Sequence, residues 1–157
     1  MNLKIGPGFE RYHEDAQYVT TEVDASATET YGRRYVFGTL DQTSVSASIR
    51  LNWTFSPRLS LETYAQPYVS TGAYRNFRSL DRPRSYDFSP YAYNEALDFT
   101  VRSLKGDAVL RWEYLPGSVL FLVWTQQRYD EDGAGEFDLS QSLGKVTKVK
   151  PENVYLV

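Results

Sequence analysis

The sequence has 157 residues, the length of one domain, and its 17 Lys and Arg against 20 Asp and Glu give a formal net charge of −3. This balance argues against the strongly basic surface of a nucleic-acid-binding domain, so we expect no nucleic-acid partner. The absence of cysteine excludes a thiol nucleophile or a cysteine-ligated cluster, and the single histidine argues against a histidine-rich metal site.

The N-terminal part predicts one strand followed by a polar connection. Residues 4–19 are compatible with a strand, residues 20–33 with a long polar loop, and residues 35–40 with the start of a second strand. No basic segment is followed by a long apolar one, so we expect no secretory signal peptide. The 13 tyrosines and the aromatic content of 15% favour β structure throughout the chain.

Residues 43–55 give the clearest pattern in the sequence. The odd positions are almost all apolar and the even positions polar, which predicts a strand with one apolar and one polar face. After the short turn at residues 56–58, residues 59–69 alternate in the same way, so the two runs predict a hairpin. If Phe55 pairs with Leu59, then Trp53 lies opposite Leu61, and similar side chains meet on both faces.

A second hairpin is predicted around the turn at residues 116–117. Pairing Leu115 with Ser118 places Tyr114 opposite Val119 and Trp112 opposite Phe121, which makes one face apolar. Long polar loops are expected at residues 70–99 and 129–152, and residues 153–157 predict one more strand. The sequence therefore predicts an all-β antiparallel meander of about six strands in a single domain, residues 1–157.

Short turns at one end and long polar loops at the other are typical of an outer-membrane β-barrel. The apolar face would then contact lipid, and aromatic residues beside the short turns would lie at one membrane interface. These candidate interface residues are Trp53, Phe55, Trp112 and Tyr114. The alternative is a soluble lipocalin-like β-barrel that turns its apolar face inward and binds a small apolar ligand.

Several segments carry a family resemblance. They include SIRLNWTFSP (48–57), LSLETYAQPY (59–68), RPRSYDF (82–88) and LRWEYLPGS (110–118). They resemble a bacterial family of unknown function, found in Bacteroidetes and related groups, that joins an N-terminal carbohydrate-binding domain similar to family-9 modules to a C-terminal outer-membrane β-barrel. The resemblance spans roughly residues 5–157.

The resemblance implies the C-terminal part of such a barrel without its final strand, and about six strands are too few to close one. It implies a location in the cell outer membrane, membrane lipid as a partner, and carbohydrate binding only through the parent protein. No residue of this chain inherits a carbohydrate-binding role. As a fragment, the sheet is expected to pair edge to edge with another copy or to aggregate.

Charged and polar residues on the other face are the candidate lumen-facing site. They are Arg50, Asn52, Glu62, Arg111 and Glu113. They either select solutes in a barrel lumen or form a structural ladder of ion pairs, and the presence of both signs on neighbouring strands favours the ladder. A glycosidase acid pair of Glu62 and Glu113 is disfavoured because nothing fixes their spacing, so we expect no enzyme activity and no cofactor or metal.

Three further features have simple structural interpretations. The acidic stretch at residues 130–138 does not match the EF-hand spacing, and a solvated loop is preferred to a weak calcium site. His13 is expected at a solvated strand end. The tyrosines of the central region are expected to hold down a long loop rather than to stack on sugars or peptides; they are Tyr68, Tyr74, Tyr86, Tyr91 and Tyr93.

Overall fold

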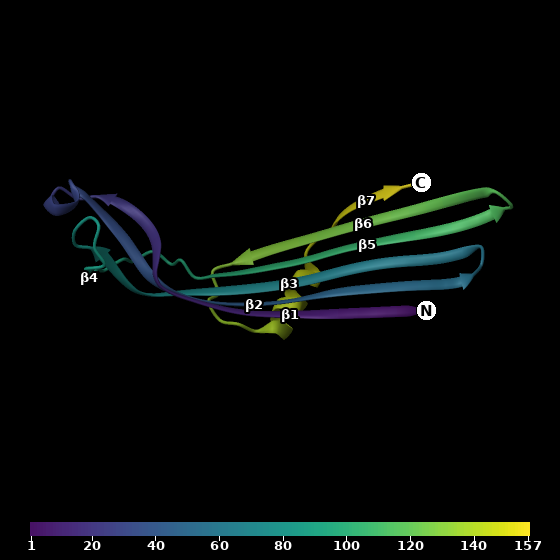
Figure 1. Cartoon of the computed structure of the whole chain (residues 1–157), viewed down its shortest axis with the longest axis horizontal. Helices are drawn as coiled ribbons and strands as arrows, with labels where there is room; N and C mark the ends of the chain where they lie inside the picture. Colours follow the sequence, from purple (N-terminus) through teal and green to yellow (C-terminus); the bar gives the residue numbers. More distant parts are fainter.

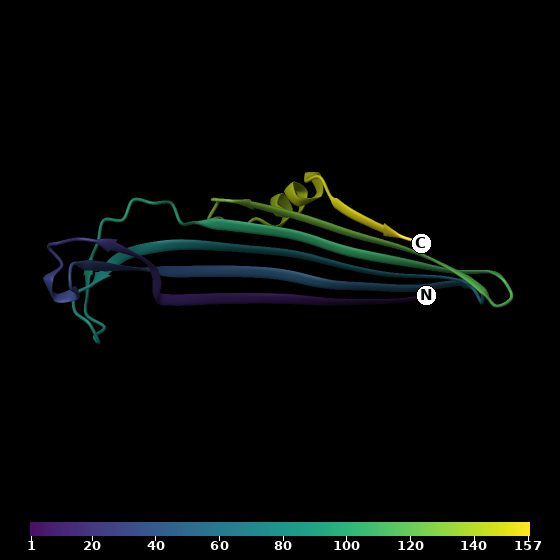
Figure 2. The ribbon, with the colours of Figure 1, turned by 90° about the horizontal axis from the view of Figure 1, so that it is seen from above.

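A computed structural model describes all 157 residues as one long antiparallel sheet with a short helix on one face (Figures 1 and 2). The five long strands are β1 (Asn2–Val23), β2 (Arg33–Ser56), β3 (Leu59–Leu80), β5 (Phe99–Leu115) and β6 (Ser118–Asp132). The shorter elements are the 3₁₀ turn η1 (Thr28–Thr30), β4 (Phe88–Pro90), α1 (Leu139–Lys148) and β7 (Glu152–Leu156). The prediction of an all-β antiparallel fold is confirmed.

The strands follow one another as a meander. Their order is β1-β2-β3-β5-β6-β7, and the short β4 pairs with β3 outside this path. β1 and β7 are the two edges and do not pair with each other, so the sheet is not closed into a barrel. The two tight turns lie at one end of the molecule, and the β1–β2 and β3–β5 connections lie at the other (Figure 1).

The predicted register of the first hairpin is confirmed over most of its length. Trp53 pairs with Leu61, and Asn52 pairs with Glu62. Only the turn differs from the prediction. A register shift between Thr54 and Ser56 places Ser56, and not Phe55, opposite Leu59. The odd positions of residues 45–55 thus share one face, called here the apolar face, and the even positions share the polar face.

The predicted register of the second hairpin is wrong by one residue. Leu115 does pair with Ser118, but a register shift follows, so that Trp112 lies opposite Leu120 instead of Phe121. The irregularity adds one residue to β5, and every later pair on β6 changes face. Consequently Leu120, Leu122 and Trp124 join the apolar face, and Val119, Phe121 and Val123 lie on the polar one.

The strands extend further than predicted, and one predicted loop contains a helix. β3 continues to Leu80 through part of the expected loop 70–99, and β6 ends only at Asp132. Within the expected loop 129–152, Asp138 caps α1 by accepting a hydrogen bond from the Gln141 backbone N–H at 2.8 Å. α1 lies against one face of the sheet (Figure 2).

The single-layer sheet leaves much apolar surface uncovered. Only 15 of the 157 residues are buried, and the accessible surface is 10602 Å². A compact monomer of the same mass, 18.0 kDa, would expose about 8,000 Å². The excess lies largely on the two broad faces of the sheet. None of the helices reaches the length and apolar content that a membrane-crossing helix requires.

Candidate functional site

The apolar face carries a band that crosses three central strands, and its β5 part lies two positions nearer the turn than the residues that pair with β3. It comprises the apolar positions of residues 45–55 on β2, 59–69 on β3 and 104–114 on β5. Leu3 and Ile5 extend the band onto the edge strand β1, where they are 53% and 61% exposed. Contiguous exposed apolar surface of this kind is uncommon in monomeric soluble proteins.

The four predicted interface aromatics lie at the turn end of this band. Trp53 stacks on Phe55 with ring centroids 4.8 Å apart, and Trp112 meets Tyr114 edge to face at 6.1 Å. All four are between 41% and 50% exposed. They therefore form two aromatic pairs, one on each hairpin, at the same end of the sheet.

The other end of the band is closed by polar and charged side chains on the same face. His13 bonds to Asp41 at 2.7 Å and to Asp15 at 3.0 Å, and Arg75 of β3 pairs with Asp41. These contacts raise the pKa of His13, with the Asp41 bond the largest cause. His13 is thus exposed, as expected, but it lies in the middle of β1 and not at a strand end, and it connects neighbouring strands.

A second charged cluster lies at the same end of the band, on β5 and β6 beneath α1. Arg102 is 1% exposed and pairs with Asp130 at 2.9 Å and Asp132 at 3.0 Å. Lys145 of α1 also pairs with Asp132, at 2.8 Å. Bonding to Arg102 and then Lys145 lowers the pKa of Asp132 well below its usual range. The interpretation of residues 130–138 as a purely solvated loop is therefore wrong.

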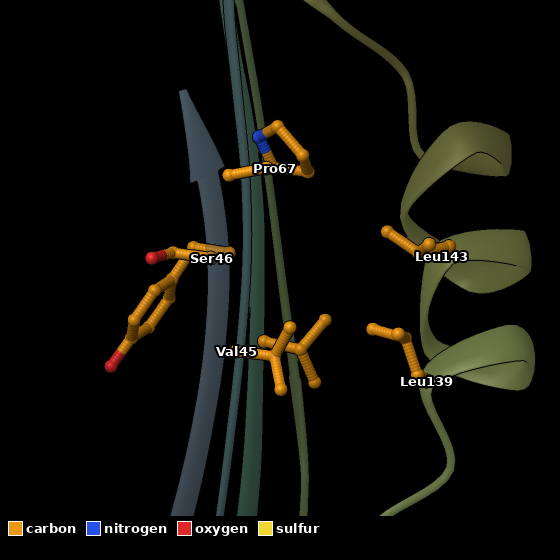
Figure 3. Close-up of a pocket in the computed structure, with 8 residues that line it drawn as sticks. Val45, Ser46, Pro67, Leu139 and Leu143 are labelled. Carbon is orange, nitrogen blue, oxygen red and sulfur yellow. The ribbon is translucent and has the colours of Figure 1, made fainter. Parts of the chain in front are cut away.

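α1 covers the band where it approaches this cluster. Leu139 and Leu143 point from the helix toward Val45 and Pro67 of the sheet, whereas Ser46 points away from the helix (Figure 3). The crevice between them holds about 120 Å³ and is almost entirely apolar. This volume is small beside the 300–1,000 Å³ typical of small-molecule pockets.

The polar face brings three of the predicted lumen-facing residues together. Arg50, Asn52 and Glu62 line one hollow of about 330 Å³, called here the polar hollow. Tyr64 and Asp107 complete its polar lining, since Arg50 pairs with Tyr64 and Tyr64 with Asp107 across the strands. Sequence reasoning missed both, because the register between β3 and β5 crosses a long connection that shows no periodicity.

The predicted ladder of ion pairs across strands is wrong for this hollow. Arg50 forms no ion pair, and its guanidinium lies over the Tyr64 ring at 5.3 Å from the centroid. Glu62 likewise has no side-chain partner. The other two predicted residues, Arg111 and Glu113, lie nearer the turn and pair within β5 at 3.8 Å.

The disfavoured acid pair is also widely spaced. Glu62 lies opposite Val109, four positions along β5 from Glu113. At about 3.4 Å per residue the two positions are offset by about 14 Å along the strand. A glycosidase pair needs about 5–10 Å between its carboxyl groups. No group of three or more potential metal-ligating side chains is found.

The central tyrosines divide between strand and loop. Tyr68 lies in β3, as the alternation of residues 59–69 predicts, and Tyr74, in the predicted loop 70–99, belongs to β3 as well. Tyr91 bonds to Glu22 of β1 and Tyr93 packs on Phe77 at 5.2 Å. Both of these hold the β3–β5 connection onto the sheet. Tyr86, by contrast, is 88% exposed.

Comparison with known proteins gives one match. The sequence model of a family described as a domain of unknown function (DUF5916) matches residues 1–155. No curated protein and no solved structure matches the chain.

Proposed function

We propose that the sheet of this chain, which belongs to the DUF5916 family of domains of unknown function, is part of an outer-membrane β-barrel. This barrel acts as a membrane anchor or passage. The proposal thus includes both the closure of the sheet into a membrane barrel and its location in the outer membrane. A link to surface carbohydrate binding in the parent protein rests on the family resemblance alone.

The dimensions of the apolar band carry the proposal. Each central strand contributes eleven residues to it, 45–55, 59–69 and 104–114. At about 3.3 Å per residue and a tilt of about 45°, eleven residues rise about 25 Å. That height equals the apolar band of outer-membrane barrels. The aromatic pairs at one boundary and the charged clusters at the other fit the two membrane interfaces.

The exposure of the two faces supports the same orientation. The apolar face is covered only by α1, and contact with lipid tails would remove the rest of it from water. The polar face carries Arg50, Glu62 and Asp107 at the depth of the band, where a water-filled lumen would keep them hydrated. The soluble alternative requires an apolar interior, and the two mainly apolar crevices here, of about 120 and 220 Å³, are both smaller than a typical small-molecule pocket.

A sheet with unpaired edges does not suit a lipid environment, because lipid offers no hydrogen bonds to backbone groups. The proposal therefore includes closure by further strands that pair with β1 and β7. These strands belong to the same protein or to another copy of it. Barrel size and oligomeric state follow from which of the two supplies them.

Cysteine accessibility tests the proposal directly. The chain has no cysteine, so Ser48→Cys and Ile49→Cys can each be introduced singly into the intact protein. A water-soluble thiol reagent is then applied to membranes from cells that produce it. We expect labelling at 48 and protection at 49. Labelling at 49 with protection at 48, or failure of the protein to fractionate with membranes, would favour the soluble binding barrel.

A further inference from the structure

The polar hollow has the chemistry of a binding site for a solute that carries both signs of charge. Its polar lining combines one guanidinium, one amide, one phenol and two carboxylates, from Arg50, Asn52, Tyr64, Glu62 and Asp107. Its volume of about 330 Å³ lies in the range of small-molecule sites. We propose that it binds a zwitterionic solute of the size of a dipeptide. This inference rests on the proposed function, since it assigns the lumen a solute.

The hollow lies halfway along the apolar band. Arg50 is the central residue of the stretch 45–55, and Tyr64 is the central residue of 59–69. On the lumen side of a barrel, ionisable groups at this depth lie in water, so their charges stay accessible to a solute.

The charged side chains of the hollow form no ion pair with one another, unlike those of the two charged clusters on the apolar face. Elsewhere Arg34, Arg82 and Arg102 each bind a carboxylate within 3.0 Å. In the hollow, Arg50 lies over the Tyr64 ring instead, and no side-chain hydrogen bond occupies its N–H groups. The donors and acceptors of both signs thus remain available to a ligand.

The arrangement suits the two ends of a zwitterion. The Arg50 guanidinium offers parallel N–H donors that match a carboxylate. Glu62 and Asp107, on the adjacent strands β3 and β5, offer acceptors to an ammonium group. Val109 and the Tyr64 ring provide an apolar surface for a side chain between them. A neutral sugar would leave the charges unpaired, and a singly charged solute would satisfy only one sign.

The test uses the dipeptide Ala-Phe and two blocked forms, N-acetyl-Ala-Phe without the ammonium and Ala-Phe amide without the carboxylate. Binding to the intact protein purified in detergent is measured by isothermal titration calorimetry. We expect Ala-Phe to bind at least tenfold more tightly than either blocked form. The neutral trisaccharide maltotriose should bind no better than the blocked forms.

Charge-specific variants separate recognition from folding. Arg50→Met should abolish the preference for Ala-Phe over its amide but keep the preference over its N-acetyl form. Glu62→Gln with Asp107→Asn should do the reverse. Arg58→Met, in the exposed β2–β3 turn, is the matched control and should bind like the wild type.

The outcomes distinguish this inference from the proposed function. If position 48 is labelled and 49 protected in membranes but Ala-Phe binds no better than its blocked forms, the zwitterion site is wrong and the barrel stands. Equal binding of maltotriose and Ala-Phe would likewise overturn it. If position 49 is labelled instead, the barrel itself is wrong and the hollow is not a lumen site.

Discussion

Replacing Ile49 with arginine tests which face of the sheet meets lipid. Ile49 lies opposite Ile5 on β1 and Ala65 on β3, close to the middle of the apolar band. An arginine at the midplane of the lipid-facing side of a barrel costs about 2–4 kcal/mol. Such a loss changes the unfolding equilibrium constant about 30- to 700-fold.

Ser48 is the matched control because it is the neighbouring residue on the opposite face. It pairs with Gly6, and the Ser48 hydroxyl already extends over the space that a Cβ on Gly6 would occupy. An arginine at 48 can therefore lie across β1 in the polar environment. We expect Ser48→Arg to change stability by less than about 1 kcal/mol, as is usual for substitutions at hydrated positions.

The assay is urea unfolding of the intact protein in lipid vesicles, followed by tryptophan fluorescence. If the apolar face contacts lipid, Ile49→Arg should lose much stability and Ser48→Arg should change little. Equal losses for both variants would refute the assignment of faces. A neutral Ile49→Arg would refute lipid contact at the centre of the band.

Three further substitutions or titrations test other contacts. Arg102→Met leaves two carboxylates without their buried cation, so hydrogen exchange in α1 should rise and stability should fall by about 1–3 kcal/mol. An NMR titration of His13 should give a raised pKa, because Asp41 hydrogen-bonds its ring; this stabilisation is present below the unfolded pKa of about 6.5 and lost as pH rises through the folded pKa. Gly72→Ala places a Cβ against the Phe99 ring and should cost about 1–3 kcal/mol.

Each of these has a result that would contradict it. Unchanged exchange in α1 would show that the Arg102 ion pairs do not hold the helix on the sheet. A His13 pKa at or below its usual value would mean that the bond to Asp41 does not form in solution. Wild-type stability of Gly72→Ala would show that the Phe99 ring can move aside at no cost.

The first hairpin could be predicted from the sequence because the apolar band imposes a period of two. Residues 45–55 and 59–69 alternate, and their register follows from matching faces. Beyond the band the alternation disappears, since both faces become polar. For this reason the pattern predicts a loop from Ser70 to Leu80, although the backbone pairing of β3 continues there.

Three features could not be predicted reliably from the sequence, each for a different physical reason. The irregularity before Leu115 changes the face of β6, and its only trace in the sequence is the apolar run Leu120, Leu122 and Trp124 on the supposedly polar side. α1 had a weak local signal, an Asp138 cap followed by apolar residues at helical spacing. The polar hollow needed the β3–β5 pairing, which no local pattern specifies.

Spin labels placed singly at positions 45 to 55 of the intact protein in membranes test the central claim most directly. Oxygen concentrates in lipid, whereas a nickel chelate stays in water, so the two relaxing agents report the environment of each label. The account predicts oxygen access at odd positions, greatest near 49 and 51, and nickel access at even positions. Nickel access at the odd positions, with protection at the even ones, would contradict it.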